Sequence, residues 1–168
     1  MRYTPAALAL SLLAAVTASV SISAPPVPLD ARAAVLVTEG RKALAEGDAN
    51  AAVDAYEAAL VIQPGHAAIL LNLAEASRKQ GMQGKALRYY REVLEGDPGN
   101  VYAISGEGQA LVEKGAIERA RRNLARLEQI CGNGCAPAIA LAAAIQQGPT
   151  PQMVSAEAVQ AKPVVTTN

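Results

Sequence analysis

The 168-residue sequence lacks Trp and Phe altogether, and its only aromatic side chains are five Tyr. It also has only one His and two Cys. With so few large side chains, the chain cannot fill a thick core with interdigitating bulky residues. Ala instead supplies 37 positions, and Ala is the best helix former and lets helices approach closely. The composition therefore favours an all-α fold of closely packed helices.

The charges balance, with 15 basic and 15 acidic residues. Neither nucleic acid nor an anionic membrane surface is therefore an expected partner. The single His66 leaves no Ser/His/Asp set to propose, and we interpret it as a solvated loop residue. There is also no Gly-rich loop after a strand that could hold phosphate. We expect a protein that is not an enzyme and that carries no cofactor and no metal.

Residues 1–24 have the order of a secretory signal peptide. Met1 and Arg2 form a short positive start, an apolar run follows, and small residues then offer cleavage sites between 18 and 24. The segment is also close to the length of a membrane span. An uncleaved inner-membrane anchor facing the periplasm is thus the alternative to an exported, periplasmic protein, and only a retained segment would give contact with the membrane. Residues 25–32 are rich in Pro and predict a short, stiff spacer.

A period of 34 residues organises the middle of the chain. Several columns repeat at this spacing, which is typical of stacked helix pairs: Gly47, Gly81 and Gly115; Ala52, Ala86 and Ala120; Tyr56, Tyr90 and Leu124; Pro64 and Pro98. Leu36, Leu70 and Ile104 hold a bulky position, and Gly40, Ala74 and Gly108 a small one. This pattern resembles the tetratricopeptide repeat (TPR) family. The resemblance implies a right-handed α-solenoid with repeat units at 33–66, 67–100 and 101–134, although Gly132 replaces the closing Pro of the third unit.

The periodicity predicts helices at 33–46, 49–62, 67–80, 83–95, 101–114 and 117–130. A capping helix at 136–147 is expected to cover the open end of the stack, because repeat arrays need a terminal element there. The helical-repeat domain would thus span 33–147. Residues 148–168 contain Pro and no helical stripe, and we expect them to be disordered.

In the resembled family, the first helix of each unit lines a concave groove that holds a peptide. By position match, the groove here would present Val37 and Arg41 from the first unit, Leu71, Asn72, Glu75 and Lys79 from the second, and Tyr102, Ser105, Gln109 and Glu113 from the third. Tyr102 is the best anchor candidate, with packing between units as its alternative role.

Some members of that family grip a terminal carboxylate with Lys and Asn from successive units. Asn72 matches one such position, but Thr38 and Gly106 stand at its equivalents. We therefore expect this carboxylate clamp to be absent.

Cys131 and Cys135 flank the sequence Gly-Asn-Gly. In an exported protein an even number of Cys usually pairs, and this turn can bring the two Cα atoms into disulfide range. We predict a disulfide that ties the capping helix to the last repeat. A thiol or metal carrier that uses both Cys is the alternative.

These observations suggest an exported, non-enzymatic scaffold or adaptor. It would bind another protein or a peptide in its concave groove, in bacterial envelope assembly.

Overall fold

The computed structural model describes residues 27–149, which contain seven helices and no strand. The helices are α1 (Ala31–Ala45), α2 (Ala49–Ile62), α3 (Ala67–Lys79), α4 (Gln83–Gly96), α5 (Val101–Glu113), α6 (Ile117–Cys131) and α7 (Ala136–Gln147). The signal peptide expected at 1–24 and the tail expected to be disordered beyond residue 149 lie outside the described residues. In the described part, no helix has the length and apolar character that a membrane span requires.

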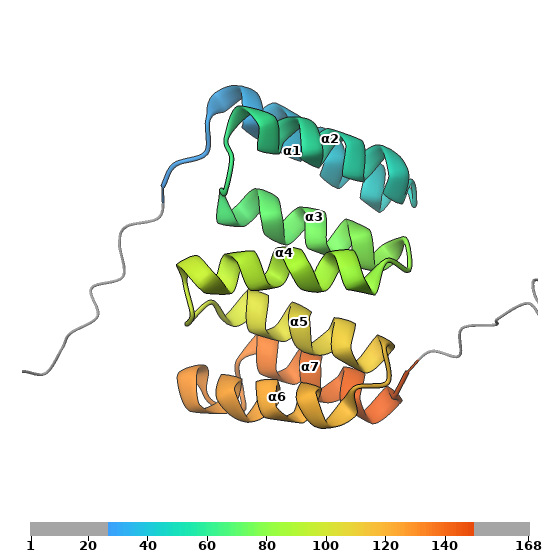
Figure 1. Ribbon diagram of the computed structural model, residues 1–168, viewed down its shortest axis with the longest axis vertical. Helices are drawn as coiled ribbons and strands as arrows, with labels where there is room; N and C mark the ends of the chain where they lie inside the picture. Colours follow the sequence, from blue (N-terminus) through green and yellow to red (C-terminus); the bar gives the residue numbers. More distant parts are fainter. Residues whose placement is uncertain (1–26, 150–168) are drawn as a thin grey trace, which may run out of the picture.

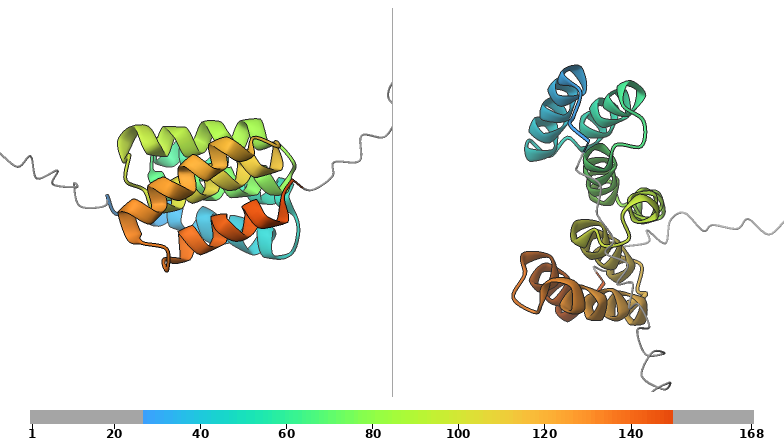
Figure 2. Two further views of the ribbon diagram at one scale, coloured as in Figure 1. Left: turned by 90° about the horizontal axis from the view of Figure 1, so that it is seen from below. Right: turned by 90° about the vertical axis from the view of Figure 1, so that its left-hand side faces the viewer.

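The helices form three antiparallel pairs stacked in chain order, α1 with α2, α3 with α4, and α5 with α6 (Figure 1). The single helix α7 packs against both α5 and α6 at the end of the stack, where the first helix of a further pair would lie (Figures 1 and 2). The all-α solenoid predicted from the 34-residue period is thus confirmed.

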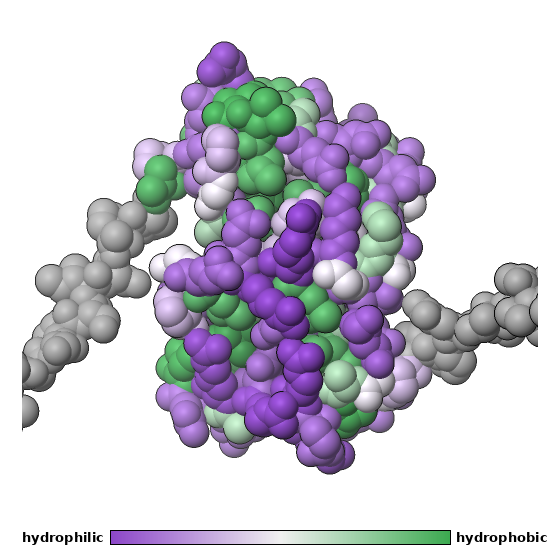
Figure 3. Space-filling model, in the orientation of Figure 1, coloured by the Kyte–Doolittle hydropathy of each residue, from purple (hydrophilic) through white to green (hydrophobic). Residues whose placement is uncertain are grey.

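The stack is bent, with its two ends on the same side of its middle (Figure 2, right). Contacts between units identify the inner side of the bend. In the described chain α1 touches α3 and α3 touches α5, whereas α2 does not touch α4 and α4 does not touch α6. The first helix of each pair therefore lies on the concave side. Figure 3 shows one broad face of the stack, which is mostly hydrophilic except toward α1 and α2.

A repeated turn joins the two helices of each pair. Gly47 has a φ of +86°, and Gly81 and Gly115 each have a φ of +76°, a conformation that ends a helix and that Gly adopts without strain. Asp48 then caps α2 by accepting a hydrogen bond from the Ala51 amide at 2.9 Å. The period in the sequence therefore reflects a period in backbone geometry.

Small residues at the helix crossings let Tyr side chains fill the thin core. The side chain of Tyr56 is fully buried in the first unit, and a Cβ placed on Gly40 would lie 2.5 Å from its ring. Ala52, Ala86 and Ala120 are all fully buried on the second helices. The aligned columns of Gly40 and of Ala52 are thus columns of the core, and in the column of Tyr56 only Leu124 is partly exposed.

The chain before α1 packs on the first unit, and the helix starts two residues earlier than expected. Asp30 caps α1, and its backbone amide donates to Gln63 Oε1 at 2.9 Å. The Gln63 side chain in turn donates to the Pro28 carbonyl at 3.1 Å. His66 is only partly exposed and lies 3.0 Å from the Val27 carbonyl oxygen, so its interpretation as a solvated loop residue is corrected. Residues 27–30 are therefore part of the folded domain.

Candidate functional site

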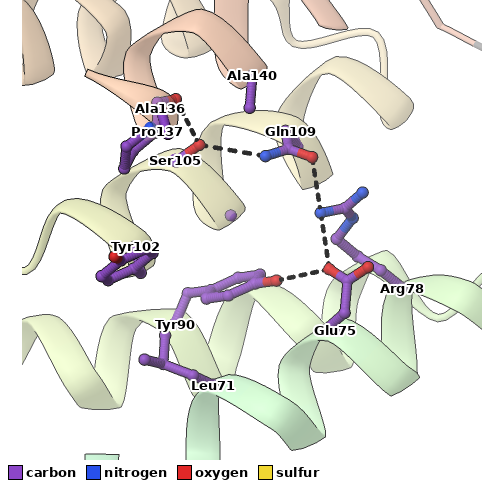
Figure 4. Close-up of a pocket in the computed structure, with 11 residues that line it drawn as sticks. Leu71, Glu75, Arg78, Tyr90, Tyr102, Ser105, Gln109, Ala136, Pro137 and Ala140 are labelled. Carbon is purple, nitrogen blue, oxygen red and sulfur yellow. Dashed lines mark hydrogen bonds and ion pairs between the residues drawn. The ribbon is translucent and has the colours of Figure 1, made fainter. Parts of the chain in front are cut away.

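A cavity of about 310 Å³ opens between α3, α5 and α7, all on the concave side (Figure 4). Its lining is mostly apolar, with a polar group at one side. The lining residues are Leu71, Glu75, Arg78, Tyr90, Tyr102, Ser105, Gly106, Gln109, Ala136, Pro137 and Ala140. A concave, largely apolar space with a few convergent polar groups is the usual form of a binding site.

The polar side of the cavity is organised by Arg78. Its guanidinium donates to Glu75 at 3.0 Å, to Glu113 at 3.0 Å and to Gln109 at 3.1 Å, and its side chain is only 12% exposed. Burial acts to lower the pKa of Arg78, but the nearby Glu75, Tyr90 and Glu113 outweigh it and raise the pKa. Arg78 therefore stays charged, and two carboxylates already neutralise it.

The floor of the cavity is the ring of Tyr90, which comes from α4 and passes beneath Gly106 of α5. A Cβ on Gly106 would lie 2.3 Å from two ring carbons, so only Gly leaves room for the ring. The Tyr90 hydroxyl points to Glu75 at 3.5 Å. Burial, with a smaller effect of Glu75, raises the pKa of Tyr90 against the opposing effect of Arg78. The phenol is thus a neutral group at the bottom of the site.

The wall opposite Arg78 comes from the start of α7. The Ser105 hydroxyl donates to the Pro137 carbonyl at 2.8 Å and accepts from the Gln109 amide at 3.1 Å. One chain of hydrogen bonds therefore links α7 through Ser105 and Gln109 to Arg78 (Figure 4). The Tyr102 side chain stands at the mouth and is 68% exposed.

Comparison with known proteins gives a consistent result for the fold. No family model and no curated protein sequence matches the chain. Among solved structures, the Sgt2 TPR domain from Aspergillus fumigatus is similar with a TM-score of 0.64 and 25% identity, over 70% of this chain and 77% of that one. The TPR2B domain of yeast Sti1, solved as a complex with pHsp70, has a TM-score of 0.62 and 22% identity, over 70% and 98%.

A third similar structure is the first TPR of Spaghetti (RPAP3), bound to the HSP90 peptide SRMEEVD. Its TM-score is 0.61 and its identity 21%, over 69% of this chain and 91% of that one. The chain folds as a TPR array.

Five of the ten residues predicted for the groove line the cavity of this TPR array. They are Leu71, Glu75, Tyr102, Ser105 and Gln109. Two more lie beside it, since Glu113 binds Arg78 and the exposed Lys79 lies 4.0 Å from Glu75.

The other three predicted residues lie away from the cavity. The Arg41 guanidinium approaches Asn72 Oδ1 at 3.4 Å, in a contact between the first and second units. Val37 was expected on the groove surface, but it is 2% exposed and belongs to the core, so this expectation is corrected. On this turn of α1, the side chain at the surface is that of the next residue, Thr38.

Sequence reasoning missed the residues that come from elements other than the groove stripe. Arg78 was not singled out although it lies three residues after Glu75, a spacing at which oppositely charged side chains meet on a helix. Tyr90 was noted only as one position of a repeated column; it is 3% exposed, but one part of its ring reaches the cavity. Ala136, Pro137 and Ala140 were seen only as parts of a cap.

Asn72, Thr38 and Gly106 stand at the three positions where the family resemblance would place a carboxylate clamp. Asn72 donates to the Ala68 carbonyl of its own helix at 2.6 Å. Thr38 likewise donates to the Ala34 carbonyl at 2.8 Å. Gly106 has no side chain, and the Tyr90 ring takes the adjacent space. The two polar side chains thus each donate to a carbonyl of their own helix, and the third position has no side chain.

Cys131 and Cys135 form a disulfide, with Cα atoms 5.9 Å apart. The bond joins the last residue of α6 to the residue that precedes α7. Each sulfur is thus bonded to the other, which leaves neither as a metal ligand in this oxidation state. The disulfide fixes the helix that forms one wall of the cavity.

Proposed function

We propose that this chain is a non-enzymatic scaffold or adaptor that binds another protein or a peptide in its concave groove. The observation that carries the proposal is the cavity itself. It is apolar, lies on the inner side of the bend and has the exposed Tyr102 at its mouth. Exposed Tyr side chains beside apolar pockets are frequent anchors of protein interfaces.

The similar structures support this use of the groove. Two of them were solved as complexes, one with an HSP90 peptide and one with pHsp70. Their TPR domains are of similar extent to this one, since the match covers more than nine-tenths of each. A peptide or a segment of a protein is thus the class of partner that this fold accommodates.

The start of the sequence supports a place in the bacterial envelope. The order of positive, apolar and small residues in 1–24 is that of an export signal, and the protein would then act in the periplasm, in envelope assembly. N-terminal sequencing of the protein from producing cells tests this. A first residue between 19 and 25 supports export with cleavage, whereas an intact Met1 in the membrane fraction supports the anchored form.

Photo-crosslinking from two positions tests the groove. A photoreactive residue replaces Lys79 at the edge of the cavity or Glu92, which is exposed on α4 and outside the groove. In producing cells we expect a specific adduct from position 79 and none from position 92. The captured partner is then identified, purified and titrated against the chain.

With the purified partner, Tyr102→Ala is expected to weaken binding about tenfold, which corresponds to the loss of a single anchor. Val61→Ala is the matched control, because Val61 is 81% exposed on α2 and outside the cavity. Equal adducts from both positions, or unchanged affinity of the Tyr102 variant, would refute binding in the groove.

A further inference from the structure

The cavity in the third unit differs from the rest of the groove because Gly106 lacks a side chain. The equivalent positions 34 and 68 residues earlier hold Asn72 and Thr38. The Tyr90 ring lines the cavity, whereas the ring of Tyr56, its equivalent 34 residues earlier, is fully buried. A Cβ on Gly106 would lie 2.3 Å from the Tyr90 ring. The missing side chain at Gly106 thus lets the Tyr90 ring form the floor of the cavity in the third unit.

Among the described residues that line or border this space, Arg78 and Lys79 are the cations, and each has an acidic partner. Arg78 already donates to Glu75 and Glu113, and the remaining cation, Lys79, lies 4.0 Å from Glu75. These four side chains sum to zero charge. A ligand carboxylate would be attracted by Arg78 and Lys79 but repelled by the carboxylates of Glu75 and Glu113. A ligand cation would be attracted by the two carboxylates and repelled by the two cations.

The neutral walls favour an uncharged side chain instead. Leu71 and Tyr90 come from the second unit, Tyr102 from α5, and Pro137 and Ala140 from α7. The volume of about 310 Å³ is at the lower end for ligand pockets, which suits one bulky side chain and not a whole folded ligand. Removing such a side chain from water is favourable in proportion to its apolar area.

We infer that this cavity binds one bulky, uncharged, apolar side chain from the interior of a peptide segment. Recognition does not depend on a terminal carboxylate. The inference rests on the proposed function, because it names the chemistry of the partner that the same groove holds. It also gives α7 a role in specificity, since α7 supplies one wall.

NMR titration with defined peptides tests the inference on the ¹⁵N-labelled full chain. The probes are acetylated and amidated heptapeptides of Gly and Ser with a central Phe, Leu, Lys or Glu, and the central-Phe peptide with a free C-terminal acid. We expect shifts at the backbone amides of Gly106, Gln109 and Ala140. The Phe and Leu peptides should bind at least fivefold more tightly than the Lys and Glu peptides. The Kd of the central-Phe peptide with a free C-terminal acid should lie within twofold of the Kd of its amidated form.

Two matched variants on α7 locate the binding. Ala140 lines the cavity, and Ala143 is also exposed on the same helix but lines a different face. Ala140→Phe places a ring in the cavity and is expected to weaken binding of the central-Phe peptide at least tenfold. Ala143→Phe should leave its affinity unchanged, which separates a filled cavity from a disturbed helix.

Several outcomes would overturn the inference. These are tighter binding of the Glu peptide or of the free acid, equal effects of the two α7 variants, or binding only after residues 150–168 are deleted. The last result would assign the cavity to the chain's own C-terminal segment. A groove adduct from position 79 together with any of these results would leave the proposed function intact. The reverse pattern, peptide binding without an adduct, would support the apolar specificity and contradict the expectation of a groove partner in the producing cells.

Discussion

At the scale of single residues, the absence of a side chain decides how closely two helices approach. Gly106 is the clearest case, because its Cα faces the ring of Tyr90. Gly108 shows the same on another face of α5, where a Cβ would lie 2.5 Å from Leu141 of α7. Gly40, Gly106 and Gly108 are therefore positions of close contact, and their conformational cost is offset by the packing that they permit.

Gly106→Ala is expected to destabilise the chain by about 1–3 kcal/mol, because the Tyr90 ring must move to make room for the added methyl group. Gly84→Ala is the matched control, since Gly84 also lies in a helix but its Cβ would meet no atom within 4 Å. That control should be neutral or more stable by up to about 1 kcal/mol, as expected when Ala replaces Gly in a helix. Urea unfolding measures both, and equal effects would contradict the packing argument.

Tyr90 predicts how stability depends on alkaline pH. Burial raises its pKa in the folded state, so the folded chain keeps a proton that the unfolded chain loses above about pH 10. The contribution of Tyr90 to the free energy of unfolding is thus present below about pH 10 and declines as the pH rises further. Tyr90→Phe removes the titrating group and is expected to reduce the loss of unfolding free energy between pH 9 and pH 11. Urea unfolding at both values measures the difference.

The control for this pH series is Leu94→Met, on the same helix and without a titrating group. Between pH 9 and pH 11 this variant should lose as much unfolding free energy as the unmodified chain. Some loss should also remain in Tyr90→Phe, because burial raises the pKa of Tyr56, with a further rise from Glu75 and an opposing effect of Arg41. If Tyr90→Phe loses as much unfolding free energy between pH 9 and pH 11 as the control, Tyr90 does not titrate in this way.

At the scale of helices, the ends that carry local signals were predicted well. The bounds 49–62 match those of α2, because Asp48 caps its start and Pro64 follows its end. The start of α1 was placed two residues late although Asp30 offers the same kind of cap. There the Pro-rich segment was interpreted as a spacer, and only the contacts between Pro28 and Gln63 show that it packs on the repeat.

The cavity depends on contacts between helices and was only half predicted. A position on the stripe of one helix, such as Leu71 or Gln109, follows from matching the repeats to the groove of the resembled family. That Tyr90 crosses under Gly106 does not, because it depends on how two helices from different units approach. Burial of Val37 is a similar case, since one residue of rotation about the helix axis moves a side chain from the surface to the core.

The disulfide acts on a single element, α7. A disulfide stabilises a protein mainly by reducing the chain entropy of its unfolded state. This one closes a very short loop, so its expected stabilisation is small, about 2 kcal/mol. The double variant Cys131→Ser with Cys135→Ser is expected to lose about that much stability. Amide hydrogen exchange should accelerate in α7, while the amides of α1 and α2 keep their protection, because the disulfide contacts only the last repeat.

Reduction of the unmodified chain with a thiol reagent is the comparison for this double variant. It should produce the same exchange pattern, since both treatments remove the same bond. A uniform increase of exchange in all helices would instead mean that the disulfide stabilises the whole domain.

At the scale of the whole molecule, stability is built up between neighbours along one dimension. In the described chain each unit contacts only the units beside it, and α7 covers the end of α5 and α6. In such arrays the free energy of unfolding approximates a sum of unit and interface contributions. A defect at one end should therefore open that end first and reach the other end weakly.

Leu141→Ala tests this picture, because Leu141 is fully buried where α7 meets Gly108. We expect a loss of about 2–5 kcal/mol from the cavity that is left behind. Ile139→Ala is the matched control, since Ile139 lies on the same helix and is 56% exposed. Hydrogen exchange should accelerate in α5, α6 and α7 of the Leu141 variant and leave α1 and α2 unchanged, because no contact joins α7 to the first unit. If protection is lost equally in all units, the chain unfolds as one cooperative body, and the additive description of the array is wrong for this protein.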